Sequence, residues 1–312
     1  MYTRRWWLVV ALAIVGGVGL GIAIHLPSDA PGHGMGSHSK EPISADRSYH
    51  RIVSLSPSIT ECLFALHLGD RVVGVTDFCD YPPEALTKSK VGGYYDLNLE
   101  AVASLRPDLV VCLPEHADYL VDLDRLGLAH LTVDHRRVEA ILESLMTLGK
   151  TCGVPERAKE LVRDIRQRIS VVRKRVVDEK RPRVLMCVGR NMRSPTIEDV
   201  YLAGRGGFYD EMITLAGGTN VYEGKLLFPM ITGEGLLRLQ PEVIVDMVPD
   251  LSDKGVTEAE IRRQWESFAD LPAVKQGRVF LFTDDFGVVP GPRFIQALEK
   301  LADVIHPKEI EP

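Results

Sequence analysis

The sequence has few aromatic residues, no excess of basic residues and no closely spaced pair of cysteines. Aromatic residues make up 7% of its 312 residues, and 43 acidic residues outnumber the 37 lysines and arginines. The net negative charge argues against a general nucleic-acid-binding protein, whose domain would be basic. Five cysteines without a C-x-x-C pair indicate neither a zinc ribbon nor a disulfide scaffold. The length and the 45% hydrophobic content predict an ordinary globular chain of about two domains.

Catalytic motifs are also missing. The chain has no H-E-x-x-H, no G-x-S-x-G and no P-loop sequence. Ser56 and Ser58 follow the first predicted strand, where a serine most often begins a helix. A serine hydrolase would need a histidine and an acid beside one of them. We therefore predict that the protein is not an enzyme and has no catalytic residue and no resident metal or cofactor, and we keep an exported hydrolase as a minor alternative.

The N-terminus has the pattern of an export signal or membrane anchor. Arg4 and Arg5 precede an uncharged apolar run from Trp6 to Ile24, which is long enough to span a bilayer. We predict a signal peptide or anchor over residues 1–30 and a flexible linker, rich in Pro, Gly, Ser and His, over 31–50. The rest of the chain is then expected in the periplasm or at the extracytoplasmic face of the cell membrane, anchored there if the segment is not cleaved.

Short apolar runs alternate with amphipathic stretches after residue 50. This alternation is typical of parallel sheets covered by helices. Strands are predicted at 51–55, 71–76, 108–113 and 130–134, and again at 183–188, 242–248 and 278–283. Helices are predicted at 58–68, 99–105, 117–126 and 138–149, and again at 208–216, 233–239, 258–268 and 292–305. We therefore predict an α/β protein of two lobes, 51–153 and 182–312, each a mainly parallel sheet covered by helices.

One long helix is predicted to join the lobes over residues 154–181. Apolar residues recur at spacings of three and four from Ala158 to Val176. Pro155 suits the first turn of a helix, and Pro182 ends the pattern. A helix of this length is stiff, so we expect little closure of one lobe onto the other.

A short segment of the first lobe has a copy in the second. Residues 98–108 match 232–242 at one offset of 134, and Glu100 matches Glu234. A good N-cap residue precedes each glutamate by two positions, which places both carboxylates in a first helical turn. One explanation of the repeated placement is that a carboxylate in the first turn interacts favourably with the helix dipole. The other explanation is a surface role that both lobes share.

Aromatic residues follow several predicted strand ends. Because ligands of α/β proteins bind at the carboxyl ends of the strands, these side chains predict a flat apolar crevice for a planar ligand. Packing under loops is the competing explanation. His116, with Glu115 beside it, follows the strand 108–113 at the same edge and is a further candidate for ligand contact. The candidate ligand-binding residues are Phe78, Tyr94, Tyr95, His116, Phe228, Asp285 and Phe286.

Five motifs, in order, resemble the periplasmic iron-siderophore and cobalamin-binding proteins that feed ABC importers. They are RIVSLSPSITE (51–61), DYPP (80–83), NLE (98–100), LRPDLV (105–110) and GGTN (217–220). The resemblance extends from about Arg51 to His306 and is strongest to the cobalamin-binding branch. It implies a two-lobed transport protein that holds its ligand between lobes bridged by a long helix.

The resemblance also implies roles for individual residues. Aromatic residues of the cobalamin branch match Phe78, Tyr94, Phe228 and Phe286, and an aspartate matches Asp285. The family's two permease-docking glutamates match Glu100 and Glu234. The expected partners are therefore an ABC importer permease and a metal-chelate ligand, cobalamin or another corrinoid being favoured.

Departures from the branch leave other ligands open. Tyr94-Tyr95 and Phe228 stand where the branch has tryptophan, and His116 has no counterpart. A ferric siderophore or haem is the alternative ligand, and a zinc or manganese ion is a less favoured one.

Overall fold

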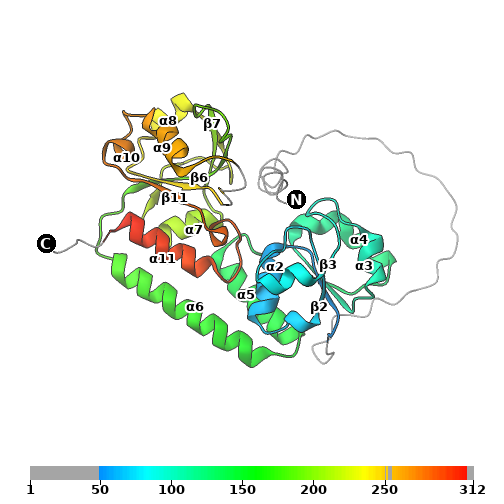
Figure 1. Ribbon diagram of the computed structural model, residues 1–312. Coiled ribbons are helices and arrows are strands. Elements are labelled where there is room, and N and C mark those ends of the chain that lie inside the picture. The colour runs from blue at the N-terminus through cyan, green and yellow to red at the C-terminus, as the bar shows by residue number, and fades with distance from the viewer. Residues whose placement is uncertain (1–48, 250, 252–254, 308–312) are drawn as a thin grey trace, which may run out of the picture.

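The computed structural model describes residues 49–249, 251 and 255–307. The predicted export segment, 1–30, lies outside the described residues, as does the predicted linker except Tyr49 and His50. None of the helices within the described ranges combines the length and the apolarity needed to span a bilayer. The chain folds into two α/β lobes that lie side by side along one long helix (Figure 1). The predicted fold class is confirmed.

The N-terminal lobe, or N-lobe, contains a five-stranded parallel sheet in the order β3-β2-β1-β4-β5. Its strands are β1 (Ile52–Ser54), β2 (Val72–Val75), β3 (Ser89–Lys90), β4 (Leu109–Cys112) and β5 (His130–Thr132). Its helices are α2 (Pro57–Ala65), α3 (Leu99–Ser104), α4 (Ala117–Arg125) and α5 (Val138–Thr151). Every residue of β1 and β4 is buried, as expected for central parallel strands covered on both faces.

The C-terminal lobe, or C-lobe, contains a sheet in the order β11-β10-β6-β7-β9, with β8 beside β6. Its strands are β6 (Arg183–Arg190), β7 (Asp199–Leu202), β8 (Thr219–Asn220), β9 (Met230–Thr232), β10 (Val243–Met247) and β11 (Val279–Phe282). Its helices are α7 (Phe208–Leu215), α8 (Gly233–Leu239), α9 (Glu258–Glu266), α10 (Pro272–Lys275) and α11 (Phe294–Ile305). The strands β6, β10 and β11 are parallel, whereas β7 runs antiparallel to both β6 and β9. The strands β3, β7, β8 and β9 were not predicted: β3 and β8 have only two residues, and neither β7 nor β9 consists of apolar residues throughout.

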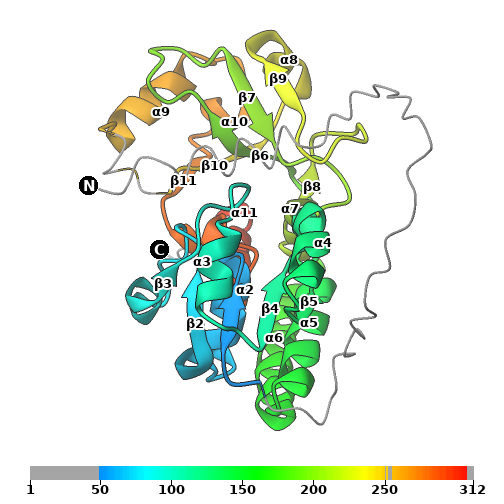
Figure 2. The ribbon, with the colours of Figure 1, turned by 90° about the vertical axis from the view of Figure 1, so that its right-hand side faces the viewer.

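The long connector is helix α6 (Pro155–Val176). Its buried side chains are spaced by four and three residues in alternation, so they form one apolar stripe. At 1.5 Å per residue its 22 residues span about 33 Å. Figure 2 shows α6 running beside α5 of the N-lobe, with α7 and α11 of the C-lobe above. The predicted bridging helix is present and is somewhat shorter than the predicted 154–181.

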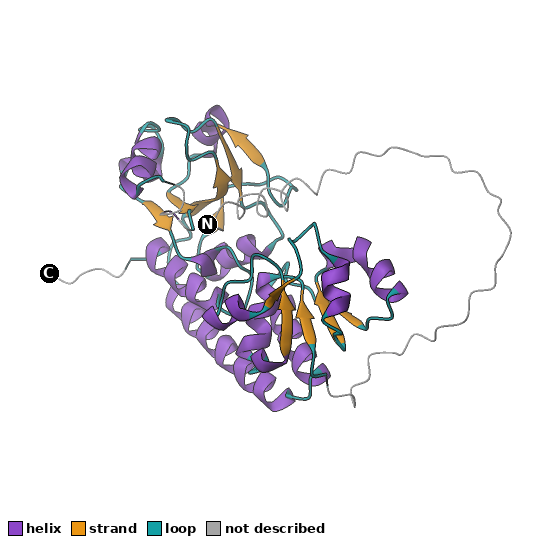
Figure 3. Ribbon diagram, turned by 45° about the vertical axis from the view of Figure 1, so that its right-hand side comes forward, coloured by secondary structure: helices purple, strands orange, loops and turns teal. Residues whose placement is uncertain are grey.

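One hydrophobic core extends through both lobes. The same buried cluster contains Ile52 of β1, Ile165 of α6, Val184 of β6 and Phe294 of α11. Figure 3 shows the block of helices against which both sheets pack. Salt bridges tie α6 to α11, with Arg168 bound to Glu299 at 2.7 Å. This continuous core favours a nearly fixed relation between the lobes.

Candidate functional site

Tyr94 and Tyr95 lie on a tight loop after β3. A bridge between Gly92 and Leu97 closes the loop, and Gly92 has a φ of 97°. A Cβ at Gly92 would lie 2.6 Å from the carbonyl oxygen of Asp96, so the turn requires glycine. The Tyr119 hydroxyl of α4 donates to the Tyr95 carbonyl at 2.5 Å. The loop therefore holds both tyrosine rings in fixed positions at the end of the N-lobe sheet.

His116 packs directly behind Tyr94. The ring centroids of Tyr94 and His116 are 4.7 Å apart, and those of Tyr94 and Tyr95 are 4.8 Å apart. His116 is fully buried, and its Nδ1 accepts a hydrogen bond from the Leu113 N–H at 3.0 Å. Burial lowers the pKa of His116 to about 4, against a smaller opposing effect of the Tyr94 backbone, so the ring is neutral near pH 7. The predicted residues Tyr94, Tyr95 and His116 thus form one cluster, in which His116 supports the tyrosine.

Burial affects the acidity of the tyrosines too. Burial, with a contribution from the carboxylate of Glu115, raises the pKa of Tyr94 and Tyr95. Both phenols therefore keep their protons at neutral pH and act as hydrogen-bond donors with apolar ring faces.

Phe228 lies on the corresponding loop of the C-lobe. Backbone hydrogen bonds on either side of it fix this loop to the end of β7, from Gly204 N–H to Leu227 and from Leu202 N–H to Pro229. The approach at Gly204 leaves no room for a side chain, because a Cβ there would lie 1.7 Å from the Leu226 carbonyl oxygen. The Phe228 ring packs against the Tyr209 ring of α7, with centroids 6.4 Å apart.

Aromatic residues of both lobes share the central core. Tyr94 of the N-lobe and Phe228 and Phe286 of the C-lobe are half-buried and pack against the cluster that runs through both lobes. Phe78 follows β2 and is 8% exposed. Three of the predicted aromatic side chains, Tyr94, Phe228 and Phe286, thus come from both lobes and lie against one common core.

Asp285 belongs to a charged cluster that joins the lobes. Its carboxylate accepts two hydrogen bonds from the guanidinium of Arg293, at 2.9 and 2.7 Å. The same guanidinium donates to Glu61 of helix α2 in the N-lobe at 2.5 Å and lies 3.5 Å from the centre of the Tyr81 ring. Glu61, Tyr81, Asp285 and Arg293 are called the inter-lobe cluster below.

The inter-lobe cluster contains a carboxyl group that titrates near neutral pH. The side chain of Glu61 is only 2% exposed. Burial raises its pKa to about 7, although the hydrogen bond from Arg293 acts in the opposite direction. Burial alone would lower the pKa of Arg293, but its bonds to Glu61 and Asp285 outweigh that effect and raise it.

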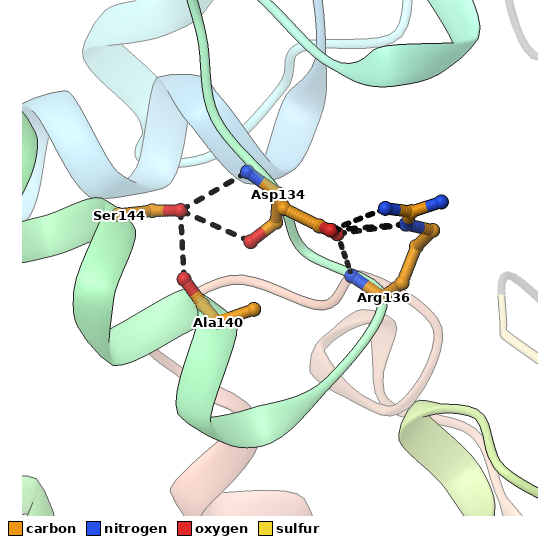
Figure 4. Close-up of polar contacts among 4 residues, drawn as sticks. All are labelled: Asp134, Arg136, Ala140 and Ser144. Carbon is orange, nitrogen blue, oxygen red and sulfur yellow. Dashed lines mark hydrogen bonds and ion pairs between the residues drawn. The ribbon is translucent and has the colours of Figure 1, made fainter.

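A second polar contact between the lobes lies at the start of α5. Figure 4 shows the preceding turn, in which the Asp134 carboxylate accepts from the Arg136 backbone and guanidinium. The Ser144 hydroxyl donates to the Asp134 carbonyl at 3.0 Å and so holds the turn against α5. Next along the chain, Glu211 of α7 accepts from Arg137 at 2.8 Å. Its other oxygen accepts from the N–H of Val138 at 2.7 Å, so a C-lobe carboxylate caps an N-lobe helix.

The turn before α5 also buries His135 against a serine. His135 Nδ1 lies 2.8 Å from the Ser58 hydroxyl, and Ser56 lies 3.0 Å from Ser58. Ser58 is 2% and His135 3% exposed, and burial lowers the pKa of His135 to about 4. Both side chains are closed off from solvent in this structure. Their contact joins the start of α2 to the turn after β5.

The two glutamates of the duplicated segment are exposed and lie in first helical turns. Glu100 is the second residue of α3, whose N-cap Asn98 accepts from the Ala101 N–H. Glu234 is the second residue of α8, whose N-cap Thr232 accepts from the Gly235 N–H. The predicted N-caps are confirmed, and each lobe presents one carboxylate to the solvent.

Neither a group of metal ligands nor the C-lobe hollow adds to the residues described so far. Among the described residues, no three His, Cys, Asp or Glu side chains are grouped as ligands of a metal ion would be. A hollow of about 620 Å³ on the C-lobe lies between residues 192–195 and α9. None of the predicted ligand-binding residues lines it.

Three members of the inter-lobe cluster, Glu61, Tyr81 and Arg293, were not predicted from the sequence as site residues. Glu61 lies in an apolar helix, flanked by Thr60 and Cys62 on its buried side, and such a buried charge requires a partner. That requirement was the available signal. Nothing in the sequence named the partner, because Arg293 lies 232 residues away.

Comparison with known proteins places this geometry in a family. The sequence profile of the periplasmic binding protein family matches residues 52–286. An uncharacterized ABC transporter substrate-binding lipoprotein of Bacillus subtilis is 30% identical over 277 residues, which cover 86% of this chain and 84% of that protein.

Solved structures share the fold. The periplasmic vitamin B12 binding protein of Vibrio cholerae superposes with a TM-score of 0.70 at 26% identity, covering 82% of this chain and 96% of that one. A periplasmic heme-binding protein of Roseiflexus gives a TM-score of 0.70 at 28% identity, covering 82% of this chain and 98% of that one. The resemblance drawn from the sequence motifs is thereby confirmed. With its two lobes, its bridging helix and a matching profile over most of its length, the chain belongs to the periplasmic binding protein family.

Proposed function

We propose that this protein captures a metal-chelate ligand between its two lobes and delivers it to an ABC importer permease. One observation carries the proposal: half-buried aromatic side chains from strand ends of both lobes lie against one shared core. Flat aromatic surfaces suit a large planar ligand. The names of the Bacillus, Vibrio and Roseiflexus proteins support a transport role with ligands of this type. The reaction is binding and release, with no covalent step.

The favoured ligand is cobalamin or a related corrinoid. Its proposed contacts are Phe78, Tyr94, Tyr95, His116, Phe228, Asp285 and Phe286, with His116 acting through Tyr94. A ferric siderophore or haem is the alternative, since a tyrosine could ligate iron.

Glu100 and Glu234 are the proposed contacts with the permease. Each is exposed in the first turn of a helix, one in each lobe. Carboxylates paired with arginines of the permease would fix the orientation of both lobes at once. Residues 1–30 would hold the protein at the extracytoplasmic face of the membrane, or direct its export if they are cleaved.

Calorimetric titration of the purified full-length protein tests the ligand. We expect one-to-one binding of cyanocobalamin, tighter than that of hemin or a ferric siderophore. Tyr94→Ala and Phe228→Ala should each weaken it by about 1–3 kcal/mol, the range for a buried aromatic contact. Tighter binding of hemin or the ferric siderophore would identify an iron chelate as the ligand. Failure to bind any of the three compounds would refute the proposal.

A double variant tests docking separately. Glu100→Ala with Glu234→Ala should leave cyanocobalamin affinity unchanged and weaken binding to the permease in proteoliposomes. Equal loss of ligand affinity in the purified double variant would contradict a docking role.

A further inference from the structure

We propose that Glu61 determines ligand specificity: as the second carboxylate on Arg293, it makes the inter-lobe cluster negative, so that the cluster accepts neutral amide groups and rejects anionic ones. The inference rests on the proposed function, because it concerns the ligand held between the lobes. It adds a residue that none of the sequence motifs assigns to binding.

The cluster lies where the two lobes touch. Glu61 belongs to α2 of the N-lobe, and Arg293 and Asp285 come from the connection between β11 and α11 of the C-lobe. A Cβ at Gly291 would lie 2.7 Å from Glu61 Oε2, so the C-lobe backbone sits directly on this carboxylate. Outward from Glu61, the side chain of Asp285 is 34% exposed and Tyr81 is 40% exposed. A ligand between the lobes would therefore meet Asp285 and Tyr81 first and Arg293 behind them.

Both terminal nitrogens of Arg293 donate hydrogen bonds within the cluster. Nη1 and Nη2 both donate to Asp285, and Nη2 also donates to Glu61. One face of the guanidinium is covered by the Tyr81 ring, and its Nε is buried without a hydrogen-bond partner among the described residues. An arginine with free, exposed donors binds carboxylates in a bidentate manner, whereas both terminal nitrogens of this one are already engaged and its side chain is only 12% exposed.

The charge balance of the cluster is unfavourable to anions. One guanidinium faces two carboxylates, so the cluster is negative when both are ionised. Asp80, which also acts on the Glu61 carboxyl electrostatically, adds a further negative charge nearby. The capacity that a ligand could reach is for accepting hydrogen bonds, at the partly exposed carboxylate of Asp285. Primary amides donate such bonds without charge, whereas the carboxylates of haem would be repelled.

Glu61→Gln separates this role from a merely structural one. The variant keeps the shape of the side chain and leaves Arg293 with a single carboxylate, Asp285, so the pair becomes neutral where the wild-type group of three charges is negative. Glu211→Gln is the matched control, since it removes the same charge from the other polar contact between the lobes. Loosening of the lobes would affect both variants, whereas a change in specificity is expected of Glu61→Gln alone.

The measurement is the affinity of full-length wild type and both variants for cyanocobalamin, hemin and hemin dimethyl ester at about pH 8, where Glu61 is ionised. We expect hemin binding to strengthen about tenfold relative to cyanocobalamin in Glu61→Gln. The ratio should stay unchanged in Glu211→Gln, and the ester, which lacks the carboxylates, should show no gain.

Each other outcome overturns the inference in a distinguishable way. An unchanged ratio in Glu61→Gln, with wild type still binding cyanocobalamin, refutes the role of Glu61 and leaves the proposed function intact. An equal gain for the dimethyl ester would show that the effect comes from the macrocycle and not from its carboxylates. An equal gain for hemin in Glu211→Gln would show that it comes from loosened lobes. Failure of wild type to bind any of the three ligands would refute the proposed function and this inference with it.

Discussion

In the N-lobe, Arg51 stands immediately before the central strand β1 and reaches the end of α3; in the C-lobe, Arg183 begins β6 and reaches the end of α8. Arg51 Nη2 donates to the Leu105 carbonyl at 2.7 Å. Arg183 Nη2 donates to the Leu239 carbonyl at 3.0 Å. Leu105 and Leu239 are separated by the offset that relates Glu100 to Glu234. Each arginine satisfies a helix carbonyl that has no partner within its own helix.

An acidic residue completes the unit in each lobe. Asp108 accepts from the backbone N–H groups of His50 and Arg51, at 2.8 and 2.9 Å. Glu242 accepts from the N–H of Arg183 at 2.8 Å. Two residues before each acid, the backbone is left-handed, with φ of 47° at Arg106 and 45° at Gln240. The two lobes therefore repeat not only a glutamate but a whole anchoring unit, and the strain of the left-handed residue is held by the bonds around it.

The lobes differ in what they bury beside this unit. Cys112 of β4 and Asp246 of β10 occupy matching positions at the same offset. The Cys112 thiol lies 3.3 Å from the Thr132 hydroxyl, whereas Asp246 forms a buried salt bridge with Arg190 at 3.0 Å. Gln264 binds Arg190 and also donates to the carbonyl of Met192, in the connection that leads into the antiparallel β7.

This difference follows the topology. In the N-lobe, helix α2 connects β1 to a parallel neighbour, whereas β6 turns back into β7 without a helix. The charged network fixes that irregular connection, where the N-lobe has a packed helix. A repeated unit can thus sit in two cores of different chemistry.

Breaking the buried salt bridge should have the largest effect. We expect Arg190→Ala to lower the free energy of unfolding by about 3–5 kcal/mol, because Asp246 is left buried without its cation. Cys112→Ala, at the matching N-lobe position, should cost only about 1 kcal/mol. Urea unfolding measures both, and similar losses would contradict the comparison. Arg190→Met with Asp246→Leu should recover most of the loss, since no isolated charge remains.

Glu61 should make the stability of the protein depend on pH near neutrality. This residue lies on α2, the helix that has no counterpart after β6 in the C-lobe. Its pKa is about 7 in the folded protein against an ordinary value of 4.5. The group thus favours folding fully below about pH 4.5, and this contribution is lost as the pH rises through 7, by about 3 kcal/mol in all. The charged groups facing it are Arg293, Asp285 and Asp80.

Thermal unfolding of wild type and Glu61→Gln from about pH 4 to pH 8 measures this contribution. The difference in Tm between them should shift in favour of Glu61→Gln as the pH rises. Protonation of the buried His116 and His135 in acid lowers the stability of wild type and of Glu61→Gln alike, so their contribution cancels in the Tm difference. A difference that stays constant with pH would mean that Glu61 does not titrate in this range.

Removing the acidic residue of the anchoring unit should destabilise the protein more in the N-lobe than in the C-lobe. Asp108→Ala loses two hydrogen bonds to backbone N–H groups and should cost about 2–3 kcal/mol. Glu242→Ala loses one and should cost about 1–2 kcal/mol. Denaturant unfolding of the two variants decides, and a larger loss for Glu242→Ala would reverse the ranking.

The helix caps should give the smallest effect and the same one in each lobe. Asn98→Ala and Thr232→Ala each remove one side-chain acceptor from a first-turn N–H. We expect each to lower the unfolding free energy by about 1 kcal/mol. Asn98→Asp and Thr232→Ser keep the acceptor and should stay near wild type. A loss in one lobe alone would show that the two caps are not equivalent.

Much of the fold was predictable because it depends on local patterns. The stripe from Ala158 to Val176 predicts α6, and apolar runs predict seven strands, namely β1, β2, β4, β5, β6, β10 and β11. The strands β7 and β9 were not predictable, since their residues become strands only by pairing with β6 and with each other. At the candidate site, Tyr94 and Tyr95 follow β3 and His116 follows β4; these strands are not neighbours in the sheet, and the structure brings the three rings together. Their contact with ligand stays a prediction.

The sequence by itself determined the two lobes, the bridging helix and the repeated glutamates, because spacing, caps and apolar periodicity act over a few residues. Only the tertiary structure decided how Arg293 pairs with Glu61 and how Glu211 caps α5. Those contacts join residues more than 70 positions apart, and nothing local marks one acid as the partner of one base. A buried charge requires some partner, but which group lies within reach is settled by the packing of the lobes along α6.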